Sequence, residues 1–181
     1  IEEKFKGKTL NENQRHLISS KLGLWSWVPN EIKQLWEEKI LCFLELFSFA
    51  ETREEFPTDD IKLLVAAEAC LLISKRDFSD YRFLRSIHVW ENQIPRQPGA
   101  HGMASMGEVH LSWKYLEKTI GNGSDGQNLV LHEFAHVIDF SDDSKAQSIP
   151  VPRTSKDYKF WEDLVSDMHQ KIVSAYEKGV E

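Results

Sequence analysis

The sequence is poor in cysteine, with only Cys42 and Cys70 among 181 residues. Both lie inside apolar, helix-like stretches, so we expect buried free thiols and no disulfide framework of the secreted type. No apolar run approaches the length needed to span a bilayer, and the first eight residues contain no apolar segment of the signal-peptide kind. These absences predict a soluble, cytoplasmic protein.

Basic residues are also few, since 22 Lys and Arg stand against 29 Asp and Glu, for a formal net charge of -7. Nucleic acids and anionic membranes both require a basic surface, so neither is expected as a partner. Hydrophobic residues make up 41% and charged residues 28%, which is the composition of a folded protein and not of a disordered one. A chain of this length predicts one domain with a sizeable core.

Hydrophobic periodicity predicts a mostly helical N-terminal part. Residues 11–56 have apolar side chains at spacings of three and four, with a helix start near Pro29 and an end at Pro57. A second helix is predicted over residues 61–74, capped by the short polar side chains that begin at Thr58. Its first turns are apolar nearly all round, so we expect this helix to be central.

The second half of the chain mixes strands, loops and helices. Strands are predicted at residues 87–90 and 108–113, on either side of a Pro- and Gly-rich loop at 94–107. Helices are predicted at 127–140 and 161–176, preceded by turn or loop segments at 121–126 and 141–156. The order predicts an α+β fold, mostly helical with a small sheet.

The strand at 108–113 alternates apolar and polar residues. Val109, Leu111 and Trp113 are expected to face the core, which leaves the polar residues, Glu108, His110 and Ser112, on the opposite face. A substrate peptide is expected to pair as an extra strand along this segment.

The predicted helix at 127–140 contains the pattern H-E-x-x-H, from His132 to His136. Residues four apart lie one turn apart on the same helical face, so two imidazoles can bind one zinc ion. Glu133 lies about 100° round the helix from His132 and can take a proton from a water at the metal's open position. The pattern predicts His132 and His136 as Zn²⁺ ligands and Glu133 as the catalytic carboxylate.

The setting of the pattern strengthens this interpretation, because random order would place it in about 3% of such chains. No Lys or Arg occurs from Gln127 to Phe140, so the helix is predicted to be buried nearly all round. Buried imidazoles and carboxylates are costly unless they are paired or bound to metal.

Three segments together resemble the Mlc titration factor A family of bacterial zinc peptidases: residues 109–113, residues 128–139, and the earlier stretch 65–72. The resemblance implies a zincin-like fold related to the anthrax lethal factor catalytic domain. It implies His132 and His136 as zinc ligands, Glu133 as the catalytic residue, and binding of a glucose-responsive transcriptional repressor.

The resemblance also implies a third zinc ligand, a glutamate in a later helix, and the sequence up to Glu181 contains no match to that segment. The chain is therefore predicted to be a single zincin-like domain over residues 1–181 that lacks its C-terminal part. Asp139 lies on the ligand face but about 10 Å along the helix from His132, so a role in holding a ligand imidazole is favoured over direct coordination. His110 remains a minor candidate for contact with substrate or metal, and His88 shows no ligand spacing.

The function predicted is hydrolysis of peptide bonds by a zinc metallopeptidase, with a peptide or protein as substrate. The alternative is a catalytically weak binding module that sequesters a regulatory protein partner. Zinc occupancy without turnover of peptides would favour this alternative.

Overall fold

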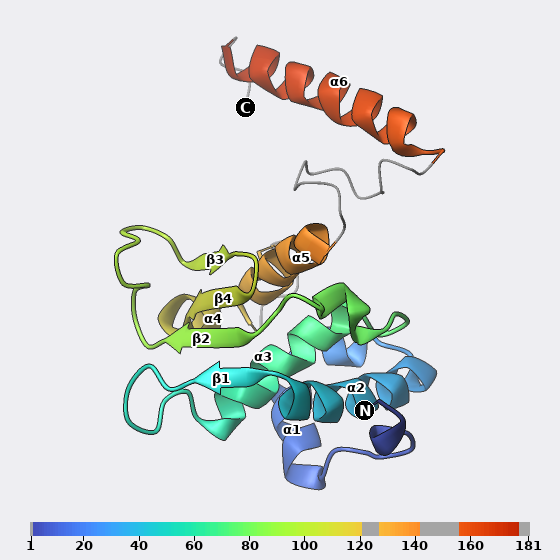
Figure 1. Ribbon diagram of the computed structural model, residues 1–181, viewed down its shortest axis with the longest axis vertical. Coiled ribbons are helices and arrows are strands. Elements are labelled where there is room, and N and C mark those ends of the chain that lie inside the picture. Colours follow the sequence, from blue (N-terminus) through green and yellow to red (C-terminus); the bar gives the residue numbers. More distant parts are fainter. Residues whose placement is uncertain (1, 121–126, 142–155, 178–181) are drawn as a thin grey trace. The chain divides into compact units, whose positions relative to one another are not determined.

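The computed structural model describes residues 2–120, 127–141 and 156–177 of the chain (Figure 1). The chain divides into two compact units, residues 1–141 and 142–181. The first unit carries the sheet and the H-E-x-x-H helix, and the second carries one long helix. Described helices and strands confirm the α+β class and the mostly helical content.

Three helices form the N-terminal part: α1 (Glu12–Lys21), α2 (Asn30–Leu46) and α3 (Asp59–Leu72). Short 3₁₀ turns accompany them at η1 (Glu2–Phe5), η2 (Gly23–Ser26) and η3 (Phe78–Tyr81). Local sequence explains the helix starts. Asn11 and Gln14 form a reciprocal capping box on α1. On α3 the Thr58 hydroxyl accepts the N–H of Ile61, and this cap is the one that the sequence predicts.

The sheet has four strands: β1 (Ser48–Ala50), β2 (Ser86–Trp90), β3 (Gly102–Ala104) and β4 (Glu108–Ser112). Their order is β1-β2-β4-β3. β2 is parallel to both β1 and β4, whereas β3 is antiparallel to β4.

The prediction of helix throughout 11–56 is wrong at its end, and the prediction of loop throughout 94–107 is wrong in its middle. Residues 48–50 form β1 and residues 102–104 form β3. Both strands are three residues long, too short to show a period of two. Each exists because a longer strand beside it supplies hydrogen-bonding partners, which local sequence does not report.

The strand predicted at 108–113 exists but ends one residue early, at Ser112. Val109 and Leu111 are fully buried and Glu108 is exposed, as predicted. Ser112 is also buried, contrary to prediction, and Trp113 begins the short helix α4 (Trp113–Thr119). The Ser112 hydroxyl donates a short hydrogen bond to the Asn92 carbonyl, which satisfies it at the strand end.

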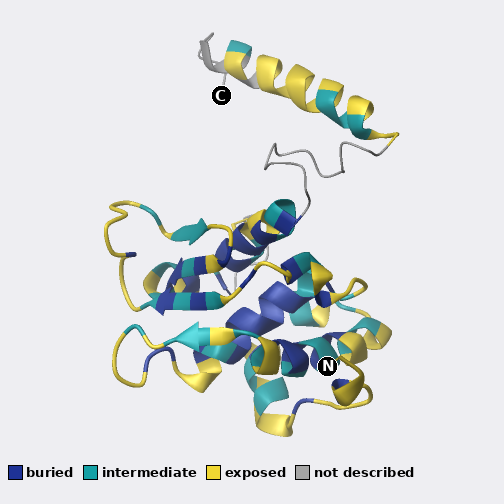
Figure 2. Cartoon of the chain, viewed as in Figure 1, coloured by how far each residue is buried: buried dark blue, intermediate teal, exposed yellow. Residues whose placement is uncertain are grey.

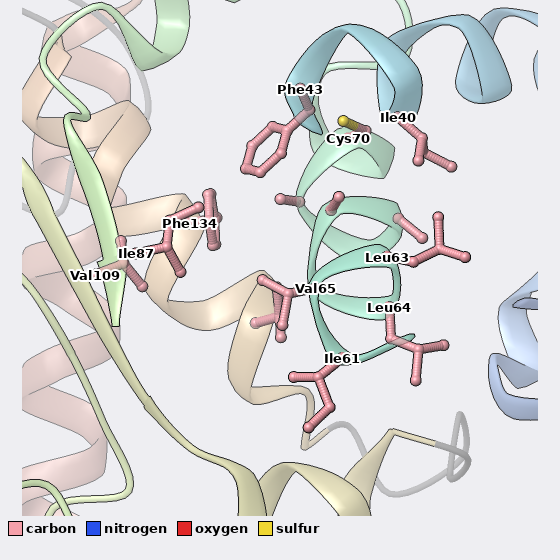
Figure 3. Close-up of a cluster of buried hydrophobic side chains, with 14 of the residues drawn as sticks. Ile40, Phe43, Ile61, Leu63, Leu64, Val65, Cys70, Ile87, Val109 and Phe134 are labelled. Carbon is pink, nitrogen blue, oxygen red and sulfur yellow. The ribbon is translucent and has the colours of Figure 1, made fainter. Parts of the chain in front are cut away.

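The core of the first unit lies between α2, α3, the sheet and α5 (Leu129–Ser141) (Figure 3). Helix α3 is central, as predicted, with Val65, Ala66 and Ala67 fully buried. Cys42 and Cys70 are buried free thiols, again as predicted. The alternating dark and lighter residues of β2 and β4 in Figure 2 mark one covered and one more open face of the sheet.

The second unit contains α6 (Tyr158–Glu177), which includes the helix predicted at 161–176. Its apolar side chains include Phe160, Leu164 and Met168, and these are exposed within the described residues. The turn predicted at 121–126 and nearly all of the loop predicted at 141–156 lie outside the described residues. None of the described helices combines the length and apolarity required to cross a membrane.

Candidate metal centre

Helix α5 carries the motif, and hydrogen bonds hold both of its ends. At the N-terminal end the side-chain oxygen of Asn128 accepts a hydrogen bond from the N–H of Leu131 at 2.8 Å. The backbone carbonyl of Asn128 accepts one from the N–H of His132 at 3.0 Å. This is N-capping by a residue type that favours it. At the C-terminal end the Arg82 guanidinium donates to the carbonyl of Ser141.

One side of α5 is anchored in the core. The Phe134 ring packs against Tyr81 at 5.4 Å and against Phe43 at 5.8 Å between ring centroids. Val130 and Val137 are buried on the same side. The backbone that carries the motif is therefore held by apolar contacts in the middle and by hydrogen bonds at both ends.

The other side of α5 is open, so the expectation of a helix buried nearly all round is wrong. His132, Ala135 and His136 are exposed, whereas Glu133 is 5% exposed. The helix lies at the margin of the unit and packs through one side only. The prediction rested on the low polarity of the helix sequence. Such a sequence is found both in helices buried on all sides and in helices buried on one side that carry a functional surface on the other.

The two imidazoles converge on a common point. Their Nε2 atoms lie 3.2 Å apart, and the ring planes are at 89° to each other. Two nitrogens bound tetrahedrally to zinc at about 2.0–2.1 Å would be about 3.3 Å apart. His132 and His136 thus fit two ligand positions of one metal ion.

Glu133 lies beside the pair and is held by the sheet. A methyl group at Gly102 of β3 would lie 2.7 Å from the Cδ atom of Glu133, and closer still to its Oε1. Only a residue without a side chain lets the strand run against the carboxylate in this way. Burial raises the pKa of the Glu133 carboxyl above its ordinary value, against the opposing effect of the two imidazoles.

A third ligand for this pair is not found in the described part of the chain. Among the described residues, neither Asp139 nor Glu133 joins the two imidazoles in a set of three close ligand atoms. This agrees with the expectation that Asp139 does not coordinate the metal directly. Its proposed contact with a ligand imidazole stays a prediction.

A second histidine cluster lies on the open face of the sheet, where His88, Glu108 and His110 bring three possible ligand atoms within 4.8 Å of one another. The two rings are stacked, with planes 9° apart and centroids 4.5 Å apart. Ligand lone pairs lie in the ring plane, so lone pairs of parallel stacked rings do not meet at one ion. In addition, the Trp90 indole donates to Nδ1 of His110 at 3.1 Å. As placed, this trio forms a stacked hydrogen-bonded cluster, and His110 belongs to it and not to the H-E-x-x-H face.

The edge of the sheet next to α5 is β3 and not β4. β4 pairs with β2 on one side and with β3 on the other, so the expectation of a substrate edge at 108–113 is wrong. Backbone hydrogen bonds tie the ends of the β3 segment to β4: Ser112 donates to His101 at 2.8 Å, and Ser105 donates to Glu108 at 2.9 Å. Because backbone direction alternates along a strand, Gly102 and Ala104 direct their N–H and C=O groups toward the edge that no described strand covers.

Sequence reasoning did not identify Gly102 or β3 as part of the site. The only available signal was a glycine within a segment rich in Gly and Pro, and that composition predicts loop. The position of Gly102 against Glu133 depends on contacts between segments about 30 residues apart.

Known proteins include a distant relative of this chain. The uncharacterized protein slr2042 of Synechocystis sp. (strain ATCC 27184 / PCC 6803 / Kazusa) is 24% identical over 180 residues. That match covers 91% of this chain and 65% of the relative, so the chain spans less than two thirds of the relative's length. No solved structure matches the chain. The model of the family described as glucose-regulated metallo-peptidase M90 matches residues 2–180, which confirms the resemblance to Mlc titration factor A, and the chain therefore belongs to this metallopeptidase family.

Proposed function

We propose that the chain is a zinc-dependent peptidase in which His132 and His136 bind the metal and Glu133 acts as the general base. The observation that carries this proposal is the convergence of the Nε2 atoms of two exposed histidines, 3.2 Å apart, beside a buried carboxylate. Membership of a metallopeptidase family supports it independently.

When bound, the zinc ion polarises a carbonyl and lowers the pKa of water toward about 7. The chain's own groups supply the rest. Glu133, seated between α5 and β3, accepts the proton of the attacking water and passes it to the departing amine. The exposed side of α5 leaves the two imidazoles open to a substrate.

The substrate is proposed to be a peptide in extended conformation that pairs with β3. The N–H and C=O groups of Gly102 and Ala104 are directed to the open edge, and Gly102 lies against Glu133. A peptide paired there would have its backbone beside the carboxylate. Main-chain pairing gives affinity with low sequence selectivity, whereas side-chain pockets would be needed for high selectivity.

The zincin-like fold relation is proposed from the family resemblance, and a third zinc ligand from coordination chemistry. Catalytic zinc usually has three protein ligands and one open position, and the motif supplies two. We propose that the third comes from outside the described residues, as in the zincin-like arrangement that the family resemblance implies. Binding of a transcriptional repressor has no support in the described contacts and stays an expectation from the resemblance.

The test separates the roles of the three motif residues. Glu133→Gln is expected to keep zinc stoichiometry and to lower peptide hydrolysis by at least about 10²-fold, because it removes the base and not a ligand. His132→Ala and His136→Ala are expected to lower both. Metal analysis and peptide turnover of the purified variants measure these effects.

Two results would count against the proposal. Zinc loss in Glu133→Gln with activity retained would overturn the assignment of the base. Zinc bound at full stoichiometry with no turnover on a broad peptide panel would favour the alternative, a binding module that sequesters a protein.

A further inference from the structure

A cavity of about 180 Å³ lies within the first unit, between η2, α2, α3 and the start of α5. Most of its wall is apolar, formed by Leu and Ile side chains and by the ring of Trp36. Its polar groups are Glu68, Gln127 and Asn128. At about 30 Å³ per water, the volume equals roughly six water molecules or one short organic ligand.

Glu68 is the unusual member of this wall, because it is a carboxyl that is only 2% exposed. One oxygen, Oε1, accepts a hydrogen bond from the Asn128 amide. Within the described residues, no other group donates to Glu68, so its second oxygen has no hydrogen-bond partner. Every fully buried side-chain oxygen in that part of the chain has a partner, so this oxygen is not fully buried. The second oxygen is therefore reachable from the cavity. Burial raises the pKa of the Glu68 carboxyl to about 7, against the opposing effect of the Asn128 hydrogen bond.

We propose that this cavity is a binding site for a primary ammonium group on a short apolar body. The ammonium would donate to the free oxygen of Glu68, and the apolar body would lie against the leucines and Trp36. A buried carboxylate with an unused acceptor is stabilised most by a charged donor, because charge-assisted hydrogen bonds in apolar surroundings are the strong ones.

The wall favours a cation over other ligands. Among the described residues that line the cavity, Glu68 is the only ionisable one, so an anion would meet repulsion and no compensating charge. The Asn128 side chain is already engaged, since its amide donates to Glu68 and its oxygen accepts from Leu131. A neutral apolar molecule would fill the space but leave the Glu68 oxygen without a donor.

The site is linked to the motif helix through Asn128, which caps α5 and donates to Glu68. A bound cation keeps Glu68 ionised, and an ionised acceptor strengthens the hydrogen bond from Asn128. Occupancy is therefore expected to stabilise the N-terminal end of α5. The binding itself does not depend on the proposed peptidase activity.

The experiment is a titration of ¹⁵N-labelled chain with n-butylammonium chloride at pH 8 and constant ionic strength. The NMR chemical shifts of the Leu131 backbone amide and the Asn128 side-chain amide are measured at each step. n-Butanol serves as the matched probe without the charge. Saturable shifts are expected with a dissociation constant on the order of 1 mM for the ammonium. Binding of the alcohol is expected to be at least about tenfold weaker.

Glu68→Gln keeps the size of the side chain and removes its charge. The variant is expected to bind ammonium and alcohol equally weakly, whereas Leu24→Phe, which fills the cavity, is expected to bind neither. Equal affinity of the wild-type chain for both probes, or an unchanged ammonium preference in Glu68→Gln, would overturn the proposal.

A measurement on the wild-type chain keeps the test decisive if a variant does not fold. Lowering the pH from 8 to 5.5 protonates Glu68, because its pKa is about 7. Ammonium affinity is then expected to fall by about tenfold or more while alcohol affinity stays constant. An ammonium affinity that does not change with pH would contradict the role of Glu68.

Discussion

At the scale of single residues, the site depends on how closely a backbone can approach a carboxylate. Glu133 is held against Gly102, and a methyl group there would also lie 2.6 Å from the Cδ1 atom of Leu129. Both crowded groups are the far ends of flexible side chains. These side-chain ends can move aside at modest cost in stability. Such a movement would, however, take the Glu133 carboxylate away from its position beside the two imidazoles.

Gly102→Ala is therefore expected to fold and to bind zinc while losing most peptide turnover. A shift of about 1 Å in a catalytic group can lower the rate about 10²-fold, whereas overpacking of this kind costs about 1–3 kcal/mol in the free energy of unfolding. Turnover, zinc stoichiometry and urea denaturation are measured together. Met106→Ala, an exposed change in the same hairpin, is the control and should alter none of them. Full activity of Gly102→Ala would show that the position of Glu133 does not depend on β3.

At the scale of elements, β3 is the strand that connects the sheet to the site. It pairs with β4 on one side, and Gly102 and Ala104 direct backbone groups to the other. A proline on an open edge removes an outward N–H without breaking the pairing inside the sheet.

Ala104→Pro is expected to raise KM for peptide substrates by about tenfold, because one main-chain hydrogen bond to the substrate is lost. Zinc binding and the unfolding midpoint should stay near those of the wild type. Ala104→Ser keeps the N–H and is expected to keep the wild-type KM. An unchanged KM in the proline variant would place the substrate elsewhere than on β3.

At the scale of the whole molecule, Glu68 makes stability depend on pH. The pKa of Glu68 is about 7 in the folded chain and near its ordinary value of 4.5 when unfolded, so the unfolded state loses the proton first as pH rises. Stability that is fully present below about pH 4.5 is therefore lost between pH 4.5 and 7, by at most about 3 kcal/mol. His88 acts in the opposite sense. Burial lowers the pKa of its imidazole, so the unfolded state binds the proton first and stability is lost as pH falls below about 6.5.

Comparison of Glu68→Gln with the wild type isolates the first effect. The variant is expected to gain stability relative to the wild type as pH rises from 5 to 8, when unfolding free energies are measured by urea denaturation at each pH. Glu54→Gln, at an exposed position, is the control and should show a constant difference. A difference for Glu68→Gln that does not change with pH would mean that Glu68 titrates normally.

The predictions that succeeded rest on local patterns. The cap at Thr58, the central helix α3, the strands β2 and β4, and helix α5 with its H-E-x-x-H motif follow from side-chain spacing within one segment. The candidate metal ligands belong to this class, because residues four apart on a helix must share a face. The sequence by itself therefore determined which residues could bind a metal.

Tertiary structure decided the surroundings of that motif. Pairing with longer strands creates β1 and β3, packing on one side of α5 leaves His132 and His136 exposed, and the topology gives the sheet edge to β3. The same long-range packing places Gly102 against Glu133, and Glu68 against Asn128. The physical reason is common to all of these features, because each depends on contacts between residues far apart in the chain. A local pattern of polarity does not report the free energy of such contacts.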